Sequence, residues 1–113
     1  MNMARIVILL ILALFSFYSV YAHEVDQYVR EAEYYQKKAD GYRREATFYL
    51  KKAEQYERDA VYYTKKGKTD TAKYYQRKAK RAMDNYKTQF RYASNANQKA
   101  ADKLKRAARL LER

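Results

Sequence analysis

Tyrosine and alanine alternate along the first half of the chain with a strict seven-residue period. The tyrosines recur at Tyr28, Tyr35, Tyr42, Tyr49, Tyr56 and Tyr63. The alanines recur between them at Ala32, Ala39, Ala46, Ala53 and Ala60. This alternating spacing places both sets on one side of an α-helix and excludes the two-residue period of a strand. A seven-residue repeat of this length predicts a long helix that packs its Tyr/Ala side against another helix in a left-handed supercoil.

The same region contains a fourteen-residue repeat. Residues 34–47 and 48–61 read YYQKKADGYRREAT and FYLKKAEQYERDAV, and they are identical at seven of fourteen positions. The extra aromatic residues Tyr34, Phe48 and Tyr62 lie fourteen residues apart, which is about 21 Å along a helix. They widen the aromatic stripe beyond what one partner helix covers. We therefore expect the protein to form homo-oligomers.

The segment KKGKTD, residues 65–70, predicts a tight turn between two helices. Lys65 and Lys66 are favourable at a helix C-terminus, and Gly67 suits the left-handed residue that follows it. Thr69 or Asp70 can cap the next helix. We expect a single domain over 23–113, with a helix at about 24–66, a turn at 67–70 and a helix at about 71–111.

The second arm also steps by threes and fours, less regularly than the first. Its predicted seam is Ala72, Tyr75, Ala79, Ala82 or Met83, Tyr86, Phe90, Ala93, Ala96 or Asn97, Ala100, Leu104, Ala107 and Leu111. The predicted fold is all-α, a long antiparallel two-helix hairpin with a coiled-coil-like Tyr/Ala seam. A four-helix bundle is the alternative if the arms break near Gly41 and Asn95. The absence of Pro and the unbroken spacing favour two long helices.

The N-terminus has the pattern of a signal peptide. Arg5 supplies a positive charge, residues 6–15 are apolar, and Val20-Tyr21-Ala22 offers small residues to a signal peptidase. We expect residues 1–22 to be cleaved after Ala22 and the mature chain to be exported to the periplasm or the exterior. A retained N-terminal anchor is the alternative.

Positive charge is concentrated in the second arm. Residues 23–66 contain 10 Lys and Arg against 9 Asp and Glu, whereas residues 67–113 contain 14 against 4. This asymmetry predicts an anionic partner such as an envelope polymer, extracellular nucleic acid or the lipid head groups of a membrane surface. A solvated surface that only keeps the protein soluble is the alternative. The candidate contact residues are Lys73, Arg77, Lys80, Arg81, Lys87, Arg91, Lys103, Arg106 and Arg109.

The residue types argue against catalysis. Residues 23–113 contain no Cys, one Ser (Ser94) and one His (His23), so no nucleophile and base pair of the usual kinds can be assembled. We expect no enzyme activity, no cofactor and no small-molecule substrate. No metal site is predicted either. His23 is a weak candidate, because as the first mature residue it would offer an amine and an imidazole near Glu24 and Asp26.

The stretch AVYYTKKGKTDTAKYYQRKAK, residues 60–80, resembles the bacterial exported small metal-binding proteins in its repeat style and its KxGxTD turn. The turn residues are Lys65 or Lys66, Gly67, Thr69 and Asp70. The resemblance implies an exported helical protein that binds metal through numerous histidines. Tyrosines such as Tyr62 and Tyr63 stand where histidines would be expected, and tyrosine is a poor metal ligand at neutral pH. Alternative functions are thus a periplasmic metal-binding protein with degenerate ligands, or a self-assembling scaffold or chaperone-like protein.

Overall fold

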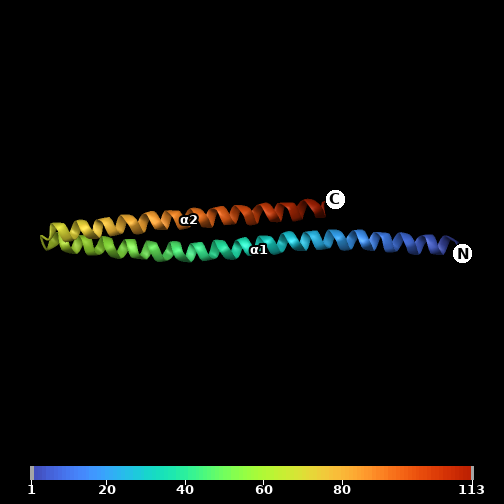
Figure 1. The fold of residues 1–113 in the computed structure, drawn as a ribbon, viewed down its shortest axis with the longest axis horizontal. Helices are drawn as coiled ribbons and strands as arrows, with labels where there is room; N and C mark the ends of the chain where they lie inside the picture. The colour runs from blue at the N-terminus through green and yellow to red at the C-terminus, as the bar shows by residue number, and fades with distance from the viewer. Residues whose placement is uncertain (1, 113) are drawn as a thin grey trace. The chain divides into compact units, whose positions relative to one another are not determined.

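The computed structural model is all-α and forms a helical hairpin (Figure 1). It describes residues 2–112, and for residues 13–20 the backbone alone. Helix α1 spans Asn2–Lys65 and helix α2 spans Thr69–Leu111, with no strand among the described residues. The prediction of an all-α two-helix hairpin is confirmed.

The four-helix alternative is wrong. Gly41 lies inside the uninterrupted helix α1, and Asn95 lies inside the uninterrupted helix α2. The helix propensity lost at one glycine is about 1 kcal/mol. Buried alanines on both sides of Gly41, Ala39 and Ala46, continue the helix packing through it. Without a proline to remove a backbone donor, this packing is enough to keep the helix continuous.

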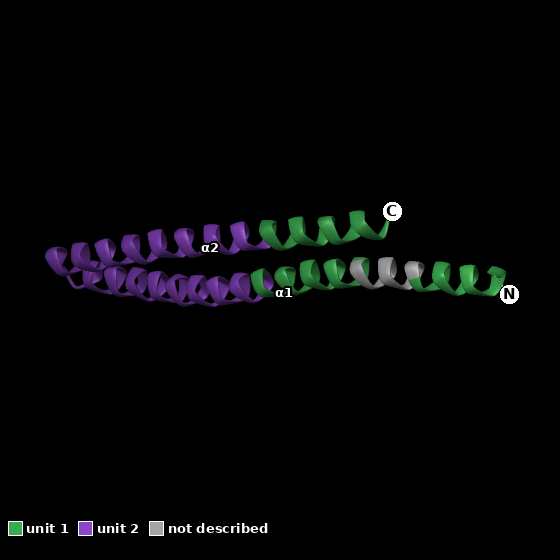
Figure 2. Ribbon diagram, turned by 45° about the vertical axis from the view of Figure 1, so that its right-hand side comes forward, with its two compact units in different colours: residues 1–35, 98–113 green, residues 36–97 purple. Residues whose placement is uncertain are grey.

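The chain divides into two compact units (Figure 2). Unit 1 comprises Met1–Tyr35 with Gln98–Arg113, and unit 2 comprises Gln36–Asn97. Within each unit a segment of α1 packs against an antiparallel segment of α2, as shown in unit 2 by the contacts of Tyr42 with Tyr92 and of Tyr56 with Tyr75. The predicted domain 23–113 therefore covers all of unit 2 and most of unit 1.

Alanine forms the buried part of both units. In α1 the buried residues are Ala32, Ala39, Ala46, Ala53 and Ala60, each at most 4% exposed. The seam tyrosines between them are half-buried. A methyl side chain keeps the opposing backbones close, and the larger phenol rings then have room only at the sides of the contact. Their hydroxyl groups can reach water there, so no buried phenol is left without a partner.

The second helix is more regular than its sequence suggests. Its buried alanines Ala72, Ala79, Ala93, Ala100 and Ala107 fall on one seven-residue series, which the half-buried Tyr86 completes. A second series contains Tyr75, Ala82, Gln89, Ala96, Lys103 and Leu110, and none of its members is exposed.

Three residues expected in the seam of α2 lie outside it. Phe90, Leu104 and Leu111 are 54%, 42% and 74% exposed. Their predicted placement is wrong because the seven-residue series continues through Gln89 and Lys103, one position earlier. Burial in α2 therefore follows the seven-residue period of the contact with α1 and not the hydrophobicity of each side chain. Polar side chains occupy some seam positions, and the apolar residues next to them are exposed.

The end of α1 at the turn agrees with the prediction, whereas the start of α2 differs from it. Gly67 has a φ of 75°, the left-handed conformation expected of it. The Lys68 amide donates to the Tyr63 carbonyl (2.9 Å) and the Gly67 amide to the Thr64 carbonyl (3.1 Å), the two bonds of a Schellman motif. The Ala72 amide donates to the Lys68 carbonyl (3.0 Å), so Lys68 occupies the cap position of α2.

The predicted cap at Thr69 or Asp70 is therefore wrong. Thr69 is the first residue of α2, and Asp70 lies in its first turn. The reason is that the Schellman motif already fixes Lys68, which leaves no room for another non-helical residue before the helix begins. Asp70 still contributes, because an acidic side chain in the first turn interacts favourably with the helix dipole.

Helix α1 begins at Asn2 and continues through the predicted cleavage site. The side chains of residues 13–20, which include the end of the apolar segment and Val20, lie outside the described residues. The described apolar side chains from Ile6 to Leu12 are 49–65% exposed. Among the residues searched, no helix is both long enough and apolar enough to cross a membrane.

The two glycines predict opposite effects of the same substitution. Gly67→Ala should lower the free energy of unfolding by about 1–2 kcal/mol, because an L-residue is disfavoured at a positive φ. Gly41→Ala should raise it by about 0.5–1 kcal/mol, because Gly41 is helical and a Cβ there would meet no atom within 4 Å. Urea denaturation of both variants measures these changes, and a shift in the same direction for both would contradict the assignment of turn and helix.

Candidate anion-binding surface

Most of the formal charge belongs to unit 2. Residues 36–97 contain 17 Lys and Arg against 7 Asp and Glu, a net +10 of the +12 carried by the whole chain. The positive charge is densest around the turn, since residues 62–81 contain 8 Lys and Arg and a single acid, Asp70. An anionic partner would therefore be attracted mainly to unit 2, and most strongly around the turn.

Five of the predicted contact residues share one side of α2 in unit 2. This α2 basic row consists of Lys73, Arg77, Lys80, Lys87 and Arg91, all exposed. Their spacings of four, three, seven and four residues repeat the helix period, so the side chains project from a single side. Asp84 is the one acid that interrupts the series. The sixth predicted residue of this unit, Arg81, is exposed and lies beside the row.

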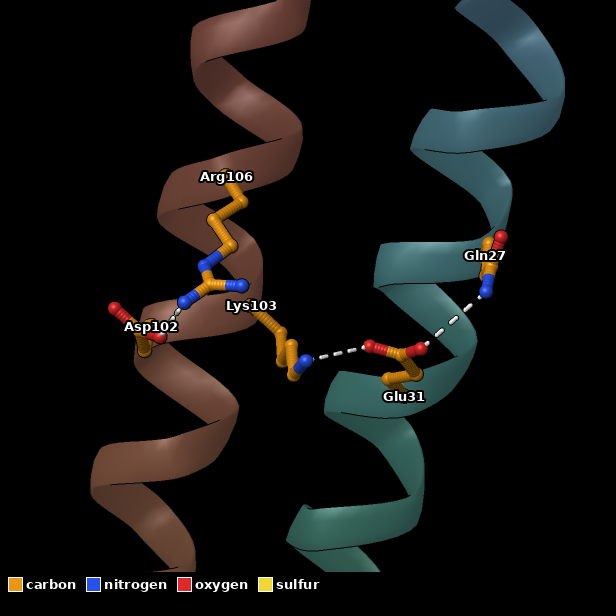
Figure 3. A network of polar contacts seen from close by, with 5 residues as sticks. All are labelled: Gln27, Glu31, Asp102, Lys103 and Arg106. Carbon is orange, nitrogen blue, oxygen red and sulfur yellow. Dashed lines mark hydrogen bonds and ion pairs between the residues drawn. The ribbon is translucent and has the colours of Figure 1, made fainter.

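The other three predicted residues belong to unit 1. Arg109 is exposed, whereas Arg106 forms an ion pair with Asp102 at 3.4 Å. Lys103 lies in the helix contact and its Nζ is 2.8 Å from Oε2 of Glu31 (Figure 3). Its charge is thus engaged within the protein. Sequence reasoning assigned Lys103 to the binding surface because it placed the neighbouring Leu104 in the seam.

The contact of Glu31 and Lys103 is the main polar link between the helices of unit 1. Gln27 Nε2 donates to Oε1 of the same carboxylate at 3.5 Å, and Oε2 is almost inaccessible to solvent. The Lys103 hydrogen bond lowers the pKa of Glu31 against the opposing effect of burial. The same hydrogen bond raises the pKa of Lys103. The Nζ atom of Lys103 also lies 5.9 Å from the ring centre of Tyr28. This cation–π contact favours the charged ammonium group, as the Glu31 carboxylate does.

Unit 2 contains a repeated arrangement of two rings and one lysine, here called the ring–lysine element. In each element two consecutive aromatic rings meet edge to face, and the lysine four residues after the first ring lies over it. The elements are Phe48-Tyr49-Lys52, Tyr62-Tyr63-Lys66 and Tyr74-Tyr75-Lys78. Ring centres lie 5.1–5.4 Å apart, and the Nζ atoms lie 5.5–5.6 Å from the first ring. Both contacts are of the favourable cation–π and T-shaped types.

The elements nearest the turn join into one tyrosine cluster. Tyr63 and Tyr75 are stacked with centres 5.3 Å apart and planes 1° apart, and Tyr56 lies 6.2 Å from Tyr75. Burial raises the pKa of the Tyr75 phenol, and the nearby Tyr63 and Asp59 raise it further. The exposed rings of Tyr62 and Tyr74 pack edge to face against the two rings of the stacked pair.

A groove connects the Phe48 element with α2. Phe48, Tyr49, Lys52 and Tyr56 line it from α1, and Lys78, Arg81, Ala82 and Asn85 line it from α2. Sequence reasoning missed this surface because it assigned Tyr49 and Tyr56 to the seam and the flanking ring of Phe48 to self-association. A signal was available, since the pattern aromatic-Tyr-x-basic-Lys places its last lysine four residues after its first ring, which is the distance of one helical turn.

His23, the weak metal candidate, has cationic side chains among its neighbours. It borders a hollow of unit 1 together with Gln27, Arg30, Glu31, Tyr34, Tyr35 and Lys103. The cationic Arg30 and Lys103 disfavour a further cation there. Asp26, one of the two candidate carboxylates, is paired with Arg30 at 2.8 Å. The described residues contain no group of three or more His, Cys, Asp or Glu that could hold a metal.

No family model, curated protein or solved structure matches this chain. The geometry of its own residues is thus the basis for a functional proposal.

Glu31 predicts a pH dependence of stability. Because its folded pKa lies below the ordinary value of about 4.5, the carboxylate stabilises the fold above that value and loses the contribution as the pH falls through the folded pKa. The thermal midpoint should fall between about pH 6 and pH 3, and Glu31→Gln should reduce that fall. Exposed Glu33→Gln is the matched control. An equal effect of both substitutions would contradict a special role for Glu31.

Proposed function

We propose that the chain is a non-enzymatic protein that binds an anionic polymer or surface through the basic side of unit 2. The observation that carries the proposal is the α2 basic row, five exposed cations with one intervening acid on a single side of a helix. The row spans 19 residues from Lys73 to Arg91, and its ends lie about 27 Å apart along the helix. Because the helix is already folded, these charges are presented without a backbone ordering cost at the moment of binding.

The first helix carries a comparable number of cations in unit 2 but also most of the acids. Its residues Lys37, Arg44, Lys51, Arg58 and Lys65 recur every seven residues on one side. Asp40 and Glu54 lie four residues before Arg44 and Arg58, and Asp40 pairs with Arg43 at 3.1 Å. These acids reduce the local positive potential. The α2 row therefore has the stronger attraction for an extended anion.

Binding of this kind is driven by neutralisation of charge and release of counterions. Each cation that meets an anionic group of a polyelectrolyte displaces condensed salt ions, so affinity falls steeply as salt is added. Lysine and arginine contacts of this type do not read a sequence. The expected ligand class is defined by charge density, which phosphate, sulfate and carboxylate polymers and acidic lipid surfaces share.

Removal of the row should weaken binding more than removal of the same charge elsewhere. We expect the variant Lys73→Gln/Lys80→Gln/Lys87→Gln/Arg91→Gln to elute from heparin at clearly lower salt than the control Lys37→Gln/Arg44→Gln/Lys51→Gln/Arg58→Gln. Both variants lose four positive charges from exposed positions of unit 2. Equal elution of the two variants would contradict the assignment to α2, and retention of the unmodified protein that does not change with salt would contradict the charge mechanism.

Export stays a prediction of the N-terminal pattern. The apolar side chains from Ile6 to Leu12 are exposed, so the packing of unit 1 does not require them. This exposure supports the prediction that the segment is removed. The mass of the chain recovered from outside the cytoplasm tests this, since residues 23–113 are expected. Self-association also stays a prediction, which the mass of the protein in solution would test.

A further inference from the structure

The ring–lysine elements place aromatic faces and positive charges side by side on the outside of unit 2. Phe48, Tyr62 and Tyr74 are the first rings of the three elements, and they are 52%, 54% and 47% exposed. Burial of exposed ring surface by a ligand is favourable. Their lysines Lys52, Lys66 and Lys78 are held over them at fixed distances. The lysine lies over one face of the ring, so each element offers the ring surface that stays exposed and one cation.

The three elements are continuous in space. Phe48 and Lys52 share their groove with Lys78, the lysine of the third element. The second and third elements are joined by the stacked rings of Tyr63 and Tyr75. The first rings of the two α1 elements are fourteen residues apart, or about 21 Å. A ligand that follows the groove toward the turn would therefore pass the cations and rings of all three elements.

We propose that this surface binds single-stranded nucleic acid, with bases stacking on the exposed rings and phosphates contacting the adjacent lysines. This inference rests on the proposed anion binding of unit 2 and adds a second surface to it, because the groove of Lys78 lies on the side of α2 opposite Lys80 of the basic row. Proteins that bind single strands without sequence preference combine a basic groove with aromatic side chains on which bases stack. The lysines supply the phosphate contacts as point charges.

Two other polyanions fit the elements less well. In a duplex the base faces are stacked on one another and only their edges are accessible, so the exposed rings would add nothing to phosphate binding. Acidic polysaccharides satisfy the cations but have no aromatic face to stack on the rings. The repeated pairing of a ring with a lysine, three times on one surface, therefore favours the single strand.

The test replaces the rings and keeps the charges. The variant Phe48→Leu/Tyr62→Leu/Tyr74→Leu retains apolar side chains at exposed positions and all lysines. The control Phe90→Leu removes a ring of the same exposure, 54%, whose ring neighbour is Tyr86. Phe90 lies on the same side of α2 as Met83, because the two residues are seven positions apart. Met83 lines a different groove together with Gln76 and Lys80. This groove is on the side of α2 opposite Lys78. The probes are a twenty-residue oligo-dT, a duplex of the same length and heparin, each over a range of salt.

We expect the triple variant to bind oligo-dT on the order of 100-fold more weakly, from the stacking lost at three rings. Its salt dependence and its retention on heparin should match the unmodified protein, and Phe90→Leu should bind oligo-dT normally. Normal oligo-dT binding by the triple variant would overturn the stacking proposal and leave charge-driven binding intact. Equal losses for oligo-dT, duplex and heparin would also overturn it. Failure of the unmodified protein to bind any probe at low salt would instead refute the proposed anion binding.

Discussion

The close contact of alanine with the opposing helix is the interaction on which the rest of the structure depends. Twelve alanines form the buried hydrophobic core of the described residues, and each is at most 7% exposed. No larger side chain is fully buried there. The individual contacts are small, and their sum along two helices replaces the compact core that a chain of this length would otherwise need. Helix propensity from Lys, Arg, Glu and Ala supports the same outcome.

The alanine contact also determines what lies outside. Because the seam has room for methyl groups, the tyrosines next to it are half-buried and the aromatic residues one position earlier, such as Tyr62 and Phe48, are exposed. The lysines one turn later then lie over those rings. The repeat that builds the scaffold therefore builds the surface as well. This is why the first helix, with nearly balanced charge, still contributes rings and lysines to the candidate surface alongside the more basic second helix.

Periodicity and turn chemistry predicted most of the fold. The seven-residue spacing of Tyr and Ala identified the packed side of α1, and Gly67 identified the turn because only a positive φ suits that position. In α2 the predicted seam was partly wrong, because the apolar Phe90 and Leu104 were assigned to it in place of the polar Gln89 and Lys103. The contact of Lys103 with Glu31 was missed because Lys103 was assigned to the binding surface, although the two residues are equally distant from Gly67 in the sequence and so face each other in a hairpin. The α2 basic row could be predicted from composition and period, and the ring–lysine elements have a sequence pattern, whereas the exposure of their first rings came from the structure.

The most direct test of the alanine contact compares two adjacent residues of unit 1. Ala100 is 3% exposed in the seam, and Ala101 is exposed on the next position of the same helix. Leucine has nearly the same helix propensity as alanine, so the two substitutions differ mainly in packing. The free energy of unfolding measured in urea should fall by about 1–3 kcal/mol for Ala100→Leu and change by less than about 0.5 kcal/mol for Ala101→Leu. Equal values for the two variants would contradict the account that close alanine packing holds the helices together.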